Sequence, residues 1–215
     1  AAIVGEEAVH DDPSLLGNLA NGTCWIIAPL DGTGNFAKGV GPFGILVALA
    51  DNGIPVGGWI FDPINGRFCS AQAGKGAWID GASFTTPKTR NTHPLLAVTR
   101  LFASNMQREA LLDTLRPHCT VVDSPRCAAD QYPRVALGGN DATLFTRTIA
   151  WDHAAGVIFL NEAGGFAARQ DASHYRCEAP DDGLIIATSK EHWERVVAML
   201  DRDGPELAGA HLASG

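Results

Sequence analysis

The stretch CWIIAPLDGTGNF, residues 24–36, joins an apolar run typical of a buried strand to a polar, glycine-rich end. Asp31 follows the apolar run, and Gly32, Thr33 and Gly34 place backbone N–H groups and a hydroxyl beside its carboxylate. Backbone amides of this kind bind phosphate, and carboxylates bind hard cations such as Mg²⁺, often one or two per ion. The stretch therefore predicts a metal or phosphate site at the end of a strand.

The same glycines also fit a dinucleotide-binding fingerprint, because residues 32–37 read G-x-G-x-x-A and Asp51 follows at a suitable distance. That fingerprint requires a helix directly after the glycines, whose N-terminus carries the pyrophosphate. Residues 38–44, KGVGPFG, contain three glycines and a proline, which disfavour a helix of useful length. A dinucleotide site is not expected.

Composition and charge narrow the class of protein further. The chain has 215 residues and a formal net charge of −8, which disfavours binding to a nucleic-acid backbone. Apolar runs such as GILVALA, residues 44–50, are shorter than a membrane span, and no secretory signal is recognisable. Five cysteines without a C-x-x-C pair disfavour a zinc site or a disulfide framework. We expect a cytoplasmic protein with reduced thiols and no membrane partner.

Hydrophobic patterning predicts an α/β fold in two parts. Residues 44–85 read as a β-meander of closely spaced antiparallel strands. The later chain alternates strands with helices: strands at 95–100, 120–124, 141–145 and 184–189, and helices at 105–115, 127–137, 151–163 and 190–200. Met106, Ala110, Leu111 and Leu115 would share the apolar face of the first helix, and Pro133 could kink or break the second. We expect an N-terminal antiparallel-sheet lobe, residues 1–92, and a C-terminal α/β lobe, residues 93–215.

Nucleophilic catalysis by serine or cysteine has little support in the sequence. There is no G-x-S-x-G motif, and none of the seven histidines is spaced to serve a particular nucleophile. His153 alone stands in a motif-like segment, and a position on a helix surface is the simpler interpretation.

Acidic residues at the ends of predicted elements favour a metal–carboxylate site. Glu6 and Glu7 follow an initial strand, Asp31 follows a second, and Asp152 opens an Ala/Gly-rich helix. Carboxylates from distant segments can converge on Mg²⁺, with the remaining ligands supplied by water and substrate phosphate. The alternative is that Asp31 and Asp152 only cap helices.

Two long motifs resemble the signatures of the inositol monophosphatase family of Mg²⁺-dependent phosphatases. APLDGTGNF, residues 28–36, is similar to D-P-L/I-D-G-T-x-N-F, and WDHAAGVIFLNEAGG, residues 151–165, is similar to the second signature. GEE, residues 5–7, matches the early acidic element, and residues 127–145 resemble the segment between the two signatures. The resemblance covers essentially the whole chain. It implies a layered α-β-α-β-α sandwich.

The resemblance also implies roles for individual residues. Metal ligands would be Glu6, Asp31, Asp152 and the carbonyl of Leu30. Glu6 and Thr33 would be catalytic and would hold and activate the attacking water. The substrate would be bound by Gly32, Thr33 and Ala128, with phosphate on the amides of the first two. Mg²⁺ would activate the water and stabilise the leaving alkoxide, without a covalent phosphoenzyme.

The sequence departs from the family pattern at several positions. Ala28 stands where the signature has a metal-bridging aspartate, and its methyl group supplies no ligand. The helical pair that usually precedes GEE is lacking, so Thr33 would lose an acidic partner and core surface would be exposed or covered by another chain. Phe145 replaces an acid that holds inositol hydroxyls in some relatives, and Arg126 and Cys127 replace small residues.

Two functions remain open. The first is a Mg²⁺-dependent phosphomonoesterase acting on a small polyol or sugar phosphate such as inositol monophosphate, impaired by Ala28 or adapted to fewer metals. The second is a catalytically inactive relative that binds a phosphorylated ligand or a protein partner. Family members are commonly homodimers, so a homodimer is expected from the resemblance alone.

Overall fold

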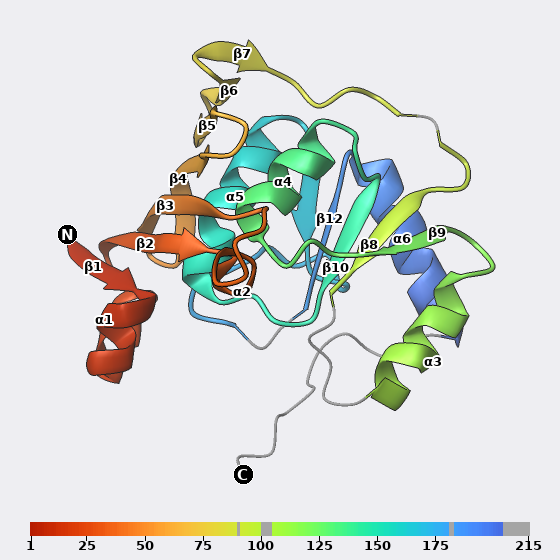
Figure 1. The fold of residues 1–215 in the computed structure, drawn as a ribbon, viewed down its shortest axis with the longest axis horizontal. Helices are drawn as coiled ribbons and strands as arrows, with labels where there is room; N and C mark the ends of the chain where they lie inside the picture. The colour runs from red at the N-terminus through yellow and green to blue at the C-terminus, as the bar shows by residue number, and fades with distance from the viewer. Residues whose placement is uncertain (90, 100–104, 181–182, 204–215) are drawn as a thin grey trace.

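The computed structural model describes residues 1–89, 91–99, 105–180 and 183–203. These residues form two β-sheets, with helices packed between the sheets and against the outside of the second sheet (Figure 1). This mixed α/β architecture confirms the predicted fold class. The described residues supply four layers in the order sheet, helices, sheet, helices, and none of their helices forms the first layer of the expected five.

The first sheet has its seven strands in sequence order. The first two strands are parallel, and every later neighbour is antiparallel, which confirms the predicted meander. A three-residue strand at its far edge was not predicted. The strands are β1 (Ala2–Gly5), β2 (Thr23–Asp31), β3 (Gly44–Asp51), β4 (Ile54–Asp62), β5 (Arg67–Gln72), β6 (Gly76–Ile79) and β7 (Ala82–Phe84).

The second sheet has the order β11-β12-β10-β8-β9 and mixes parallel with antiparallel pairs. The four predicted strands are present, and residue 100 of the first lies outside the described residues. The three-residue β11 was not predicted. The strands are β8 (Leu95–Val98), β9 (Thr120–Asp123), β10 (Ala142–Phe145), β11 (Phe166–Ala168) and β12 (Leu184–Ala187).

The four predicted helices are also present. The second continues past Pro133 without a break, and the third ends before Gly164, which has a positive φ of 86°. Two short helices and a 3₁₀ helix join them in the N-terminal part. The helices are α1 (Glu6–Asp11), η1 (Pro13–Asn18), α2 (Thr33–Phe36), α3 (Asn105–Leu115), α4 (Ala128–Ala136), α5 (Ala150–Glu162) and α6 (Lys190–Asp203).

Helices α4 and α5 lie between the two sheets and form the main core with both (Figure 1). A second core joins α3 and α6 to the other face of the second sheet. The face predicted for α3 is partly wrong, because the side chain of Met106 is 78% exposed, Ala110 is also exposed, and Leu112 is buried instead. Leu111 and Leu115 are buried as expected.

The outer face of the first sheet carries apolar side chains that the described helices leave accessible. Ile45, Phe61 and Phe68 are 40%, 37% and 42% exposed, and the rings of Trp25 and Trp59 lie 5.6 Å apart on the same face. Within the described residues, no helix is long and apolar enough to cross a membrane.

Candidate active site

Strand β2 ends in a tight corner built by Gly32. Pairing between β2 and β3 is irregular between Ala28 and Asp31, and Gly32 then adopts a left-handed conformation with φ of 78°. A Cβ atom at Gly32 would lie 2.8 Å from the carbonyl oxygen of Pro42, so the close approach also excludes a side chain. The corner turns the chain into the single-turn helix α2, which starts at Thr33. The short α2 and antiparallel β3 confirm that this is not a dinucleotide-binding unit.

Asn35 fixes this corner to two neighbouring loops. Its side-chain amide donates hydrogen bonds to the carbonyl oxygens of Pro42 and Pro125, at 2.8 and 3.0 Å. Pro125 belongs to the loop that leads into α4, 90 positions further along the chain. The end of β2 and the start of α4 are therefore held together by a side chain of the opening motif.

The carboxylate of Asp31 lies at the first turn of α4. Its Oδ2 accepts a hydrogen bond from the backbone N–H of Ala129 at 2.7 Å and another from the thiol of Cys127 at 3.2 Å. Burial raises the pKa of Asp31, and these donors oppose that shift. Asp31 therefore contacts a helix N-terminus, as the capping alternative expected, but the helix is α4 and Asp31 belongs to strand β2. The same carboxylate also lines a pocket.

Asp152 lies in the first turn of α5 and faces the other acids of the site. Burial, then the nearby carboxylates of Asp31 and Glu6, raise its pKa to about 7, while the Arg147 guanidinium opposes the shift. Asp31 and Glu6 both act on the Asp152 carboxylate, and all three side chains line one pocket, so acids from three separate elements are brought together.

A pocket of about 240 Å³ contains the predicted site residues. Its lining includes Glu6, Leu30, Asp31, Gly32, Thr33, Ala128 and Asp152. Sequence reasoning gave no role to two of its cationic side chains, Lys38 and Arg147. The available signal was their place in the sequence, since Lys38 follows Thr33 by five residues and Arg147 precedes Asp152 by five.

Ala28 is not among the residues that line this pocket. Its side chain is 1% exposed and packs in the main core with its neighbours on the inner face of β2, Cys24 and Ile26. In the described chain, no three His, Cys, Asp or Glu side chains form a ready metal cluster.

His153 is a correction to the sequence interpretation, because it is buried and not on a helix surface. Its side chain is 5% exposed, its Nδ1 is hydrogen-bonded to the Tyr132 hydroxyl at 2.9 Å, and the Phe145 ring packs edge-on against it. Burial lowers the pKa of His153 to about 3, so the ring is neutral and poorly suited to act as a base. Burial also holds the pKa of the Cys127 thiol well above its usual range, which disfavours a cysteine nucleophile.

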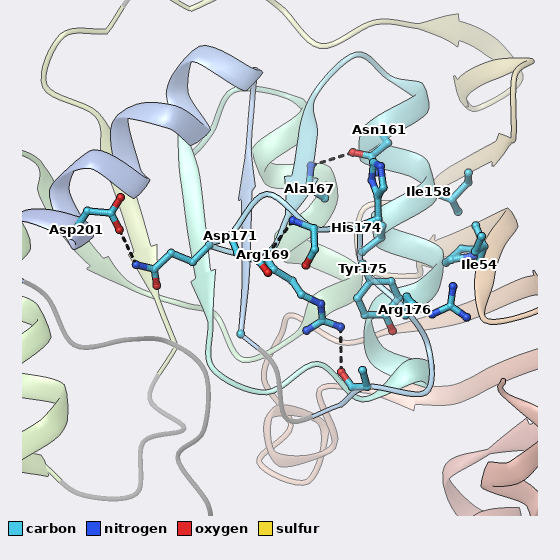
Figure 2. Close-up of a pocket in the computed structure, with 16 residues that line it drawn as sticks. Ile54, Ile158, Asn161, Ala167, Arg169, Asp171, His174, Tyr175, Arg176 and Asp201 are labelled. Carbon is cyan, nitrogen blue, oxygen red and sulfur yellow. Dashed lines mark hydrogen bonds between the residues drawn. The ribbon is translucent and has the colours of Figure 1, made fainter.

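A larger cavity of about 1080 Å³ lies alongside the second half of α5 (Figure 2). Several polar groups there already bind one another: Arg169 donates to the Ala179 carbonyl at 3.3 Å, and Gln170 donates to Asp201 at 3.0 Å. None of the predicted site residues lines this cavity. Size alone therefore does not identify the site, and the smaller pocket carries the acids.

The fold and pocket define a two-sheet α/β protein whose site gathers three carboxylates beside the tight turn at Gly32. The family model for the inositol monophosphatase family matches residues 1–203, and the chain belongs to that family.

Individual relatives and solved structures are also similar to this chain. The chain is 32% identical over 166 residues to an inositol-1-monophosphatase of Bacillus subtilis, covering 76% of this chain and 61% of that protein. It is 28% identical over 192 residues to a Nus factor SuhB of Xylella fastidiosa, covering 86% and 67%. An Anabaena inositol monophosphatase structure superposes with a TM-score of 0.78 at 27% identity, covering 95% of this chain and 79% of that one. The chain thus spans about 60–70% of the length of these two curated relatives.

Proposed function

We propose that this protein is a Mg²⁺-dependent phosphomonoesterase that acts on a small polyol or sugar phosphate, such as inositol monophosphate. The observation that carries the proposal is the meeting of Glu6, Asp31 and Asp152 with the Gly32–Thr33 corner in one pocket. Family membership and the relatives named as inositol monophosphatases support the same reaction class.

The residues present fit a hard cation. All the donors are oxygens, from three carboxylates and the Leu30 carbonyl, and Mg²⁺ commonly takes only one or two carboxylates per ion. A cation beside Asp152 would also relieve the repulsion from Asp31 and Glu6, which adds to the effect of burial in raising the pKa of Asp152. When bound there, Mg²⁺ would supply charge stabilisation and an activated water.

The chain's own groups would position the reactants. Phosphate oxygens would be held by the backbone N–H groups of Gly32 and Thr33 at the start of the short helix α2. Ala128 lines the pocket at the start of α4 and would contact the substrate. The exposed hydroxyl of Thr33 would orient the attacking water, and Glu6 would help hold it.

A second candidate function is a phosphate-ester-binding protein without turnover. It is favoured by Ala28, whose buried methyl group replaces a ligand of the family signature, and by a relative that is named a Nus factor. As proposals from resemblance, a cytoplasmic location and a homodimer apply equally to both candidates.

Phosphate release from inositol 1-phosphate and a panel of sugar phosphates, with Mg²⁺ or with EDTA, separates the two. We expect Mg²⁺-dependent release that Asp152→Asn abolishes and that Asp113→Asn leaves intact, because Asp113 is an exposed residue of α3 outside the pocket. Calorimetric binding of the same esters without any release, by this chain and by its Ala28→Asp variant, would overturn the enzyme and support the second candidate.

A further inference from the structure

Three cationic side chains from three different segments line the candidate active site. Lys38 follows α2, Arg126 precedes α4, and Arg147 lies between β10 and α5. All three are exposed, and none makes a side-chain hydrogen bond or ion pair within the described residues. Most other arginines that the structure describes are paired, for example Arg67 with Asp62 and Arg134 with Asp130.

The gathering of free cations stands out because the protein as a whole is acidic, with a net charge of −8. The pocket is lined by three acids, Glu6, Asp31 and Asp152, and by the three cations, so its formal charges balance. On the proposed function, the acids are committed to Mg²⁺. The basic side chains then have no carboxylate counterpart in the pocket, and they favour an anionic group on the ligand.

The remaining walls combine the aromatic ring of Phe145 with the hydroxyl-bearing Thr99 and Ser124. Phe145 stacks on Tyr132 and packs against His153, and it presents no acceptor for a sugar hydroxyl. The Asn35 side-chain amide is already committed to the carbonyls of Pro42 and Pro125. The three cationic side chains are therefore the charged donors that this pocket offers to the alcohol part of the ester.

We propose that Lys38, Arg126 and Arg147 form a second anion subsite, so that the preferred ester carries a further phosphate or carboxylate on its alcohol. This inference rests on the proposed function for the position of the first phosphate. Arg147 is the central member, because it lines the pocket together with Asp152, five residues before it in the chain. Its guanidinium can bind a carboxylate or phosphate through two parallel hydrogen bonds.

The test compares esters matched in carbon skeleton. Glycerol 3-phosphate is set against 3-phosphoglycerate, and fructose 1-phosphate against fructose 1,6-bisphosphate, in binding by calorimetry and in kcat/KM with Mg²⁺. We expect the second anionic group to improve affinity about 10-fold or more, the size of a hydrogen bond to a charged group. The two pairs distinguish a carboxylate from a phosphate as the second anion.

The selectivity ratio within each pair is the readout for variants. Arg147→Gln and Arg126→Gln should each lower that ratio about 10-fold, whereas Arg116→Gln, an equal charge change directly after α3 and outside the pocket, should leave it unchanged. A ratio near one for the unaltered chain, or a ratio unaffected by Arg147→Gln, overturns the subsite.

The outcome separates this inference from the proposed function. Selective binding without phosphate release would refute the enzyme and keep the subsite. Release of phosphate without selectivity for the second anionic group would support the enzyme and refute the subsite.

Discussion

The hydroxyl of Tyr132 on α4 lies 2.9 Å from Nδ1 of His153 on α5, and both side chains are buried beneath the candidate active site. This contact joins the two helices between the sheets, directly behind Asp152. His153 and Asp152 are adjacent, yet their pKa values shift in opposite directions. Burial lowers the pKa of His153 to about 3, and burial together with Asp31 and Glu6 raises the pKa of Asp152 to about 7. Both groups are therefore neutral over the same range of pH.

The two shifts should have opposite effects on stability in EDTA. In the unfolded chain the ordinary pKa values apply, 3.8 for Asp and 6.5 for His. Between these, folded Asp152 holds a proton that the unfolded chain lacks, so its contribution to stability falls as pH rises toward 7. Folded His153 lacks a proton that the unfolded chain holds, so its contribution rises with pH up to about 6.5.

Removing either side chain should leave the pH dependence that the other one gives to the free energy of unfolding. From pH 4 to 6.5, Asp152→Asn should make the free energy of unfolding rise with pH by up to about 1.4 kcal/mol per unit relative to the unaltered chain. His153→Gln should make it fall by a similar amount. Urea unfolding across this range measures both slopes, and parallel curves for all three proteins would contradict the assigned protonation states.

Ala28→Asp tests whether position 28 lies beside a cation site. In EDTA the new carboxylate would be buried and unpaired in the main core, which should cost about 3–5 kcal/mol of stability. Added Mg²⁺ should restore much of this loss, since a ligand that binds only the folded state stabilises that state.

Ala48→Asp is the matched control for this prediction, because Ala48 on β3 is equally buried at 1% exposure and lies outside the pocket. Thermal unfolding with and without Mg²⁺ should show recovery for the variant at position 28 only. Equal Mg²⁺ responses in both variants would place position 28 away from the ion.

Thr33→Ala should reduce kcat by about 100-fold or more while changing KM little, because a group that positions the attacking water acts mainly in the transition state. Thr33 is exposed at the start of α2, so stability should stay nearly constant. Thr33→Ser keeps the hydroxyl and should retain most of the rate. Phosphate release under saturating substrate measures the effect, and equal rates for the two variants would remove the proposed role.

Gly156→Ala should destabilise the protein, by about 1–3 kcal/mol or more, through overpacking between α4 and α5. A Cβ atom at Gly156 would come within 2.1 Å of the ring of Tyr132, which is fully buried. Gly17→Ala is the control, since nothing lies within 4 Å of its added Cβ, and it should change stability by less than about 0.5 kcal/mol. Urea unfolding of both variants checks the contrast.

Regular periodicity made most of the fold predictable. The meander and the four later helices follow from alternating or helical apolar spacing, whereas β7 and β11 have only three residues each and too little pattern to detect. The burial of His153 was missed because α5 lies between two sheets and is buried nearly all round, so no exposed face exists for it. The run of apolar residues through that helix was the signal for this arrangement.

The acids of the site were predictable because each stands at the end of an element, and the motifs that they share resemble a known family. The cationic part was not. Lys38, Arg126 and Arg147 stand in three separate connections, and only the folded chain brings those connections to one pocket. Phe145 was likewise not predicted as a wall of the pocket. Its ring packs against Tyr132 of α4 and His153 of α5, and only the fold brings these two helices to it.

Gly32 and Gly34, two glycines of the opening motif, differ in whether another residue can replace them. At Gly32, the left-handed backbone and the nearby Pro42 carbonyl leave room for hydrogen alone. At Gly34, two residues later, an added Cβ would meet open space. Saturation mutagenesis of the pair should return a single residue at position 32 and a broad spectrum at position 34. Sequence drift at this corner would then enter through its second glycine.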